Sequence, residues 1–401
     1  MISGFRQKLG FWTKEVITTW KSKSNWIWFH AVSVGELIAV LPLVKEVSDK
    51  KTVYPIMISC TTNAGYNLAK EKTKNKNILV FYFPFDLPIT INSLLNYAKV
   101  KLLIIAETEI WPITLSICKR KNIPVILVNA RLSDRSFKNY FLLKFYFKNI
   151  VNLFTKVLAQ SKTDTSKFIK LGIDNNKIET IGNMKFACFS NNGNMALNKE
   201  WHIDIDNEKI STEKLIFAST HPGEDEIAIN TFKDLRKDFP TLRLIIAPRH
   251  IDRVDSIATL IKKNGFNPIF RSKTQKINSA NDIFLLDTIG ELASFYSICK
   301  MTILCGSFVK IGGHNILEPI KANSYTIIGP YDFKISDLSN LFKEKEAIIQ
   351  VNNVLDLKTK IIEGLKNTEL IGITIKRGQN IIKENGNILP QITKHIFEYL
   401  P

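Results

Sequence analysis

Short apolar runs alternate with polar or helix-like stretches along the first half of the chain. The runs are rich in Ile and Val and begin near residues 26, 54, 78, 101, 123 and 156: "WIWFHAVS", "YPIMISCTT", "ILVFYF", "KLLIIAE", "IPVILVNA" and "KVLAQS". Runs spaced so that a helix fits between them are typical of a parallel sheet covered on both faces. The first half is therefore expected to form a doubly wound α/β unit.

The same pattern begins again after a polar stretch near 190–211. The later runs are "KLIFAST", "LRLIIAPRH", "IFLLD", "MTILCGS" and "YTIIGP". Two consecutive Rossmann-like units are expected to face a central cleft, with their strand ends gathered around a ligand. This α/β architecture fits a GT-B glycosyltransferase, an epimerase or a periplasmic binding protein, so the fold alone does not choose a function.

The pattern divides the chain into five segments. The expected boundaries are 1–25 for an amphipathic membrane-associating segment, 26–190 for the N-terminal Rossmann-like domain, 191–211 for a linker, 212–385 for the C-terminal Rossmann-like domain, and 386–401 for a helix that could return to the N-terminal domain.

The first 24 residues have an amphipathic pattern of their own. Apolar side chains recur at helical spacing, with basic residues elsewhere around the helix. This pattern predicts an interfacial membrane helix, and the alternative is a helix that packs on its own domain. The apolar positions are Phe5, Leu9, Trp12, Val16 and Trp20.

Composition places the chain among ordinary globular proteins. Of its 401 residues, 45% are hydrophobic and 23% are charged, which argues against wholesale disorder. The five cysteines include no CxxC pair, and no His lies at metal-ligand spacing, so reduced thiols, no metal and no cofactor are expected. Neither a transmembrane run nor a signal peptide is expected.

Positive charge is concentrated in the first half of the chain. Residues 1–200 hold 29 Lys and Arg against 13 Asp and Glu, whereas residues 201–401 hold 26 against 24. The resulting +16 and +2 indicate an anionic partner for the first half, and a solvated Lys-rich surface is the alternative. Nucleic acid is not expected, because the chain shows no RNP-like aromatic pattern and no helix-turn-helix context.

Glycine and polar residues gather after one strand of the second half, in "GSFVKIGGHNILEP". Gly312 and Gly313 would let backbone N–H groups approach a phosphate beside a helix N-terminus, near which Asn315 lies. Glu318 could accept hydrogen bonds from ribose hydroxyls. The alternative for the glycines is a tight turn without a ligand.

Three other strand ends of the second half carry polar groups, and together they predict a nucleotide site. Arg249 is suited to phosphate, because its fork of donors matches the phosphate oxygens. The candidates are Ser219 and His221 in "FASTHPGEDE", Arg249 and His250 in "IIAPRH", and Gly290, Glu291 and Leu292 in "DTIGELASFY".

The first half carries carboxylates at its strand ends instead. Glu36 ends "HAVSVGE", while Glu107 and Glu109 lie in "AETEIWP". Unpaired acids beside apolar strands tend to have raised pKa values, which suits a general base, although Glu36 could simply cap its helix. Arg131 and Arg135, four residues apart, could bind phosphate or hold these carboxylates.

Seven motifs together resemble the Kdo transferases of lipopolysaccharide synthesis. They are "HAVSVGE", "FPFDLP", "AETEIWP", "NARLSDRS", "ASTHPGEDE", "APRH" and "GGHNILEP", and they run in the family's order between about residue 26 and about residue 330. The resemblance implies a metal-independent, inverting GT-B enzyme that moves 3-deoxy-D-manno-octulosonic acid (Kdo) from CMP-Kdo to a lipid A precursor.

The resemblance also implies roles for the candidate residues. Glu36 matches the proposed catalytic base, with Ser33 and Gly35 beside it as support for the acceptor. The donor would bind the C-terminal domain, where Arg249 and the Gly312 and Gly313 backbone would face its phosphate. The lipid acceptor would bind the N-terminal domain.

The implied location is the cytoplasmic face of the bacterial inner membrane, with peripheral attachment to anionic lipid through the basic half and the first 24 residues. Two other interpretations stay open. One is another GT-B transferase or a nucleotide-sugar epimerase. The other is a non-catalytic protein that binds lipid or RNA through the basic half.

Overall fold

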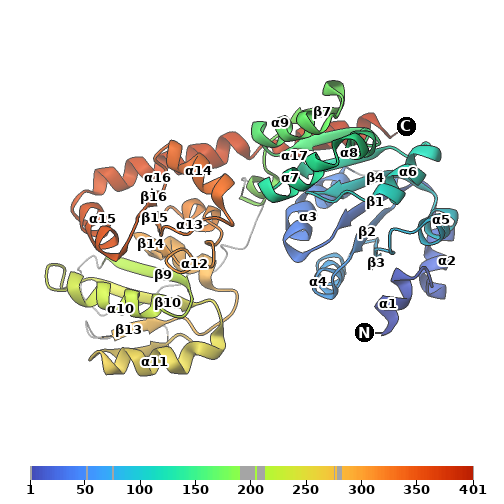
Figure 1. The fold of residues 1–401 in the computed structure, drawn as a ribbon. Helices are drawn as coiled ribbons and strands as arrows, with labels where there is room; N and C mark the ends of the chain where they lie inside the picture. Colours follow the sequence, from blue (N-terminus) through green and yellow to red (C-terminus); the bar gives the residue numbers. More distant parts are fainter. Residues whose placement is uncertain are drawn as a thin grey trace. The chain divides into compact units, whose positions relative to one another are not determined.

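The chain folds into two compact units in the computed structural model, which describes residues 2–50, 53–74, 76–189, 204–205, 213–274, 276–277 and 282–400 (Figure 1). The first unit comprises Met1–Gly193 and Asn385–Pro401, and the second comprises Asn194–Glu384. Most of the expected linker 191–211 lies outside the described residues.

A seven-stranded parallel sheet forms the centre of the N-terminal unit, in the order β3-β2-β1-β4-β5-β6-β7. Every residue of β1 and β5 is buried, as expected for strands covered on both faces. The strands are β1 (Trp26–Ala31), β2 (Ile56–Cys60), β3 (Ile78–Tyr82), β4 (Val100–Ala106), β5 (Val125–Ala130), β6 (Lys156–Ala159) and β7 (Ile178–Thr180).

Helices cover this sheet, and the last helix of the chain, α17, contacts α3 of the same unit (Figure 1). The helices are α1 (Ile2–Lys8), α2 (Lys14–Ser22), α3 (Val34–Asp49), α4 (Asn63–Thr73), α5 (Pro88–Tyr97), α6 (Pro112–Arg120), α7 (Asp134–Leu142), α8 (Lys144–Val151), α9 (Lys162–Leu171), α17 (Ile388–Glu398) and the 3₁₀ turns η1 (Asn175–Lys177) and η2 (Met184–Phe189).

The C-terminal unit repeats the design with a parallel sheet in the order β11-β13-β10-β9-β14-β15-β16. A two-stranded ladder pairs β8 with β12. The strands are β8 (Asp204–Ile205), β9 (Lys214–Thr220), β10 (Arg243–Pro248), β11 (Asn267–Phe270), β12 (Lys276–Ile277), β13 (Asp282–Leu285), β14 (Met301–Leu304), β15 (Tyr325–Ile328) and β16 (Ile349–Gln350).

The helices of this unit include the long α16, which ends at the boundary with the N-terminal unit. They are α10 (Glu224–Leu235), α11 (Val254–Lys263), α12 (Leu292–Ile298), α13 (Leu317–Lys321), α14 (Ser336–Glu344), α15 (Val354–Lys366), α16 (Thr368–Asn385) and the 3₁₀ turn η3 (Ile251–Arg253). The expected fold class, two doubly wound α/β units, is confirmed by these two sheets.

The order of strands reverses once in each sheet. In the N-terminal unit the reversal lies between β1 and β4, and in the C-terminal unit it lies between β9 and β14. The loops that follow two such strands diverge to opposite faces and leave a crevice at the carboxyl edge, where ligands of open α/β sheets bind. The loops after these four strands are therefore the places to look for chemistry.

The first 24 residues form two short helices rather than one amphipathic helix. Trp20 is fully buried, Val16 is buried as well, and Trp12 packs against the same core. Trp20 meets Trp12 and Phe81 edge to face, with ring centroids 4.9 and 5.3 Å apart. The prediction of one interfacial helix is wrong for these three positions, and the alternative of a helix packed on its own domain is correct for them.

Phe5 and Leu9 remain exposed, as does Phe11 in the turn between α1 and α2. Gly10, with φ of 85°, ends α1 and allows the chain to turn before α2 begins. In the part of the chain that the structure describes, no helix combines the length and apolarity needed to cross a membrane.

Replacing Trp20 with Ala should lower the free energy of unfolding by about 3–5 kcal/mol, because it empties a packed aromatic site. Phe11→Ala is the matched control, since 64% of Phe11 is exposed, and it should change stability by less than about 0.5 kcal/mol. Urea denaturation measures both. Equal losses for the two variants would show that α2 is not part of the core.

Candidate active site

Glu36 lies in the first turn of α3, directly after β1. Its carboxylate accepts hydrogen bonds from the Val32 N–H at 2.7 Å and the Ser33 hydroxyl at 3.0 Å, while the Ser33 oxygen caps the helix by accepting from the Glu36 N–H. This reciprocal arrangement resembles a capping box. The capping alternative for Glu36 is therefore correct, and the same residue lies at the strand reversal where a catalytic group is expected.

Gly35 leaves open space beside this carboxylate. Among the described residues outside the backbone of its own helix and its chain neighbours, a Cβ atom on Gly35 would meet only the Ser33 Oγ within 4 Å, at 3.9 Å. The structure itself does not require glycine here, because φ is not positive and the space is free. The space on this side of α3 is compatible with the expectation that a substrate approaches it.

Three carboxylates act on one another at this strand reversal. The pKa of Glu109 is raised to about 7. Burial is the largest cause, and the charges of Glu36 and Glu107 add to it. Burial also raises the pKa of Glu36, against the opposing effect of its hydrogen bonds from Val32 and Ser33. Glu109 is therefore a second candidate base beside Glu36.

Glu107 has a backbone role of its own. Its φ of 58° is in the left-handed region, and its N–H donates to the Val128 carbonyl at 2.9 Å. This bond continues the pairing of β4 with β5 for one residue beyond the strand. The chain then turns and places Glu109 ahead of α6.

Arg131 and Arg135 lie on two different elements. The helix α7 begins only at Asp134, with Ser133 as its N-cap, so Arg131 lies in the loop after β5. Because β5 neighbours β4, Arg131 is at the same edge of the sheet as Glu107. Arg135 is exposed on the first turn of α7.

Asp86 of the "FPFDLP" motif binds the start of α6, the helix that follows Glu109. Its carboxylate accepts from the Ile113 and Thr114 N–H groups, at 3.0 and 2.8 Å, and from the Thr114 hydroxyl. These are orphan donors at the start of α6, where Pro112 is the first residue. The motif's Asp is therefore a helix cap that acts from a distant loop, which helps to fix the end of "AETEIWP".

A buried glutamate that the sequence analysis did not single out organises the C-terminal unit. The Glu224 carboxylate accepts from the N–H groups of His221 at 2.9 Å, Gly306 at 2.7 Å and Phe308 at 3.0 Å. It thereby ties the loop after β9 to the loop after β14. The signal in the sequence was an acidic triplet, Glu224 to Glu226, directly after a strand end.

The loop after β9 and the loop after β10 are held together through Thr220. Its carbonyl accepts from the Arg249 N–H at 3.1 Å and from the Arg253 guanidinium at 2.8 Å. Arg253 also forms an ion pair with buried Asp225. Arg249 and its neighbour His250 are exposed at this edge, so the Arg249 fork is accessible to an anion.

Gly312 and Gly313 differ from the expectation in one respect. Their N–H groups donate to the Gly306 carbonyl, at 2.9 and 2.8 Å, and are not directed at a ligand. Both have positive φ, and a Cβ on either would lie within 2.8 Å of the side chains of Lys334 or Ile335. The tight-turn alternative accounts for these two glycines.

Asn315 and Glu318 follow on the same loop. The Asn315 side chain accepts from the Leu317 N–H at 3.1 Å and donates to the Glu318 carboxylate at 3.0 Å. Burial raises the pKa of Glu318. The helix α13, which begins just after this loop, has only five residues.

Gly290, Glu291 and Leu292 lie after β13, which is two strands away from β9 on the same edge. The Glu291 carboxylate is held by Arg271 at 3.1 Å and by the Thr288 hydroxyl. Gly290 has φ of 86°, and among the described residues no atom beyond its chain neighbours lies within 4 Å of the place a Cβ would take. This part of the loop exposes backbone rather than the acid, and Leu292 begins α12.

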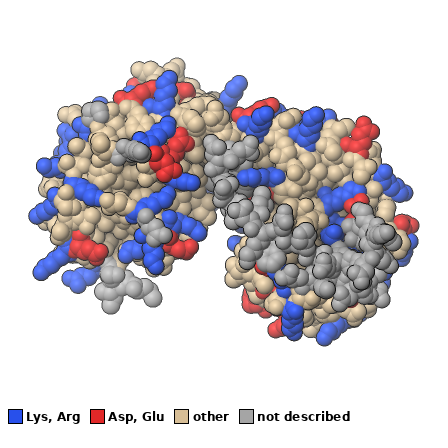
Figure 2. All heavy atoms as spheres, turned by 180° about the vertical axis from the view of Figure 1, so that it is seen from behind, with Lys and Arg blue, Asp and Glu red and all other residues tan. Residues whose placement is uncertain are grey.

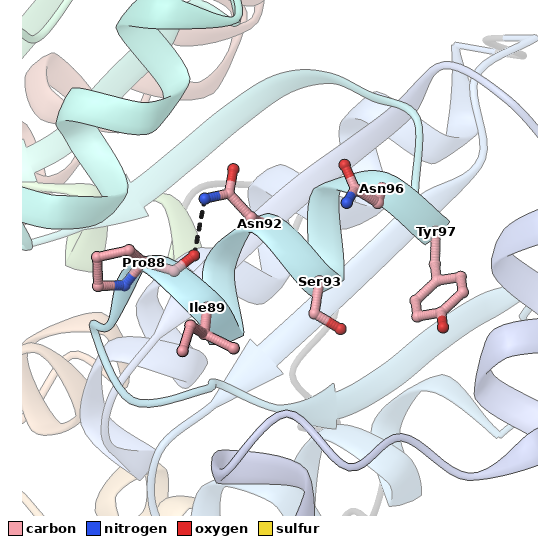
Figure 3. Close-up of a pocket in the computed structure, with 6 residues that line it drawn as sticks. All are labelled: Pro88, Ile89, Asn92, Ser93, Asn96 and Tyr97. Carbon is pink, nitrogen blue, oxygen red and sulfur yellow. Dashed lines mark hydrogen bonds between the residues drawn. The ribbon is translucent and has the colours of Figure 1, made fainter.

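A surface hollow on α5 has none of these residues in its wall. Pro88, Ile89, Asn92, Ser93, Asn96 and Tyr97 line it, and the Asn92 side chain donates to the Pro88 carbonyl at 2.8 Å (Figure 3). The hollow is on the outer side of one helix and offers no titratable acid or base other than a tyrosine. It does not mark the reaction site.

The family described as 3-deoxy-D-manno-octulosonic-acid transferase (kdotransferase) matches residues 3–188. A 3-deoxy-D-manno-octulosonic acid transferase of Haemophilus influenzae is 31% identical over 382 residues, which cover 93% of this chain and 87% of that protein. The chain belongs to the Kdo transferase family. As a member of it, the protein is a glycosyltransferase.

Two other proteins are also similar to this chain. A bifunctional glycosyltransferase/methyltransferase of Fusobacterium nucleatum is 35% identical, covering 90% of this chain, and the chain spans only 58% of that relative's length. The solved UDP-GlcNAc 2-epimerase of Neisseria meningitidis matches with a TM-score of 0.63 at 14% identity, over 94% of this chain and all of that one. At that identity the likeness shows the fold alone.

Replacing Glu109 with Gln should stabilise the Kdo transferase above pH 7 and leave stability unchanged below about pH 4.5. With a folded-state pKa raised to about 7, Glu109 stays protonated in the folded protein while it ionises in the unfolded chain, so wild-type stability falls between these two values. Thermal unfolding across this range measures the difference in Tm between the variant and the wild type.

The matched control is Glu71→Gln, because the Glu71 side chain is 69% exposed and keeps its hydration. Its difference in Tm from the wild type should stay flat over the same pH range. A flat profile for Glu109→Gln as well would mean that burial does not penalise the Glu109 charge.

Proposed function

We propose that this Kdo transferase moves Kdo from CMP-Kdo to a phosphorylated, acylated glucosamine disaccharide, the precursor of lipid A, with inversion at the anomeric carbon and without a metal ion. The observation that carries the proposal is the contrast between the two strand reversals. Carboxylates without a cationic partner in the described structure lie at the reversal in the N-terminal unit. At the reversal in the C-terminal unit, Glu224 and Asp225 are already bound by backbone N–H groups and Arg253, and the groups left for a ligand are histidines and Arg249. An acceptor hydroxyl needs a base, and an anionic nucleotide needs cations.

The transfer is a single displacement in this proposal. Glu36 takes the proton of an acceptor hydroxyl while that oxygen attacks the anomeric carbon of Kdo. The bond from that carbon to the phosphate oxygen breaks, and CMP leaves with the electron pair. Attack on the face opposite the leaving group inverts the configuration, and Arg249 offsets the charge that develops on the phosphate.

The hydrogen bonds of Glu36 fit this role in a specific way. The donors from Val32 and Ser33 hold its carboxylate in one orientation, as a base that must meet a hydroxyl requires. Burial keeps the pKa of Glu36 above its ordinary value, which makes the carboxylate a better proton acceptor. Gly35 supplies the open space beside it.

The first test is mass spectrometry of the product formed by the wild-type protein from CMP-Kdo and the lipid A precursor. An added mass of one or more Kdo residues is expected. Wild-type protein that binds both substrates and transfers nothing would overturn the proposed function. Thermal protection by UDP, without protection by CMP, would support an epimerase or another GT-B transferase instead.

The second test separates the two candidate bases. Glu36→Gln should reduce kcat by about 10²–10⁴-fold, since a positioned base contributes on that order, while Glu109→Gln should retain most of the turnover. Both substitutions remove one buried carboxylate from the same site, so each is the other's control. A large loss only in Glu109→Gln would transfer the role of base to Glu109.

We also propose that the N-terminal unit binds the membrane surface through an apolar patch formed by α1, the turn after it, the loop before α5 and the first turn of α5. Its exposed side chains come from two segments that are in contact. The Phe85 N–H donates to the Lys8 carbonyl at 2.8 Å, and the Phe5 and Phe85 rings meet edge to face. The patch consists of Phe5, Leu9, Phe11, Phe85, Leu87 and Ile89.

The apolar patch, and not charge alone, identifies the surface that would face the membrane. Lys and Arg side chains are spread across the face of the molecule in view in Figure 2. Arg6 and Lys8 lie on the patch's own helix, where they would meet anionic headgroups. Exposed aromatic and aliphatic side chains beside basic ones are typical of interfacial binding.

Point substitutions test this surface better than deletion of residues 1–24, which would remove Trp20 from the core. The double variant Phe11→Glu, Ile89→Glu should bind vesicles that contain anionic phosphatidylglycerol at least about ten-fold less well, a loss of ~1.4 kcal/mol. Val53→Glu, at an exposed position outside the patch, is the control. Unchanged co-sedimentation of the double variant would exclude this patch as the membrane contact.

A further inference from the structure

Two histidines of the C-terminal unit meet through their ring nitrogens. Nε2 of His221 lies 2.9 Å from Nε2 of His314, and the two rings are parallel to within 5°. Two bare lone pairs or two N–H groups would repel at this distance, so one Nε2 carries a proton and the other accepts it. The two rings therefore titrate as one pair.

The fold builds this pair at the strand reversal of the C-terminal unit. His221 follows β9, and His314 lies in the loop after β14, the neighbouring strand. A Cβ on Gly306 would lie 2.8 Å from the His314 ring, so glycine at that position makes room for the ring. Glu224 binds the backbone N–H groups of both His221 and Gly306, which holds the two loops in register.

The environment keeps the pair from binding an extra proton. Burial lowers the pKa of His221, and it lowers the pKa of His314 to about 4. After burial, the neighbouring basic groups Arg249, His250 and Lys334 contribute to the lowering of both pKa values. An anion bound among these groups would offset their charges, and the pair would then take up a proton.

Charged groups reach the pair from every element packed around it. The basic residues that follow β10 and β15 are exposed. Arg253 of η3 already forms an ion pair with Asp225. The Glu224 carboxylate already accepts hydrogen bonds from three backbone N–H groups. These groups are Arg249 and His250 after β10, Lys334 after β15, Arg253 with Asp225, and Glu224.

We propose that His221 and His314 form a proton-linked subsite for the carboxylate of the donor sugar. The inference rests on the proposed function, because Kdo is an acid sugar with a carboxylate on its anomeric carbon. CMP-Kdo thus brings two anionic groups, a phosphodiester and a carboxylate. The forked guanidinium of Arg249 suits the phosphodiester, and the histidine pair is left for the carboxylate.

The hydrogen-bonding capacity of the pair fits a carboxylate. Within the part of the chain that the structure describes, neither ring makes a hydrogen bond through Nδ1. In the neutral pair only one Nδ1 carries a proton. When the pair takes one proton from solvent, both Nδ1 atoms carry a proton and the pair gains a positive charge. The donor's carboxylate stays ionised and accepts from the one Nδ1–H that it meets. A neutral sugar would gain nothing from this change, so the subsite would select acid sugars.

Calorimetry with two ligands tests the proton linkage on the wild-type protein. CMP-Kdo and the methyl ester of CMP both carry a cytidine phosphodiester, and only CMP-Kdo carries a carboxylate. Titrations near pH 7 in buffers of different ionisation enthalpy count the protons taken up. Greater uptake is expected with CMP-Kdo than with the methyl ester, because only CMP-Kdo places an anion against the pair itself, and equal uptake with both would overturn the subsite.

His314→Gln tests which anion the pair serves. Loss of a charge-assisted hydrogen bond should weaken CMP-Kdo binding about ten- to a hundred-fold, with less than about a two-fold change for the methyl ester. In turnover, KM for the donor should rise more than kcat falls. His395→Gln, which changes a partly buried histidine on α17 of the other unit, is the control for fold and affinity.

The outcomes separate this inference from the proposed function. If the wild type transfers Kdo and His314→Gln weakens both ligands equally, the pair serves the phosphate and the subsite is wrong. If His314→Gln binds CMP-Kdo as the wild type does, the subsite is also wrong. If the wild type neither binds nor consumes CMP-Kdo, the proposed function fails and this inference fails with it.

Discussion

Unpaired backbone amides at the two strand reversals are the constraint on which the rest of this structure depends. Where neighbouring strands send their loops to opposite faces, N–H groups lose ladder partners and need acceptors. Each unit meets the need with a buried glutamate in the first turn of the helix after the first strand of its seven-stranded sheet, Glu36 on α3 and Glu224 on α10. Glu36 serves its own turn, whereas Glu224 joins two separate loops.

That difference gives the two glutamates different chemistry. Three amides from two loops hold the Glu224 carboxylate, so it positions the cationic edge of the C-terminal unit. The Glu36 carboxylate is held by one amide and one hydroxyl, and Gly35 leaves space beside it. The nearby acids Glu107 and Glu109 make its ionised form less favourable. The acidic reversal is suited to accept a proton, and the reversal bordered by His221 and Arg249 is suited to hold an anion.

Much of the candidate site was predictable because strand ends are visible in the sequence. Apolar runs end before Glu36, Glu107, His221 and Arg249, and parallel strands bring such positions to one edge. Details that depend on packing were not predictable. The amides of Gly312 and Gly313 are used within their own loop, and Arg131 lies in the loop after β5 whereas Arg135 lies on α7.

The sequence by itself determined the two doubly wound units and the residues at their carboxyl edges, because the alternation of apolar runs reports burial directly. Only the tertiary structure decided which groups meet. In the tertiary structure Trp20, part of an amphipathic pattern, is buried in the core, and Glu224 binds two separate loops. His221 and His314 are in contact although 93 positions separate them in the sequence. The physical reason is that hydrogen-bond partners depend on distances between loops, which local patterns do not encode.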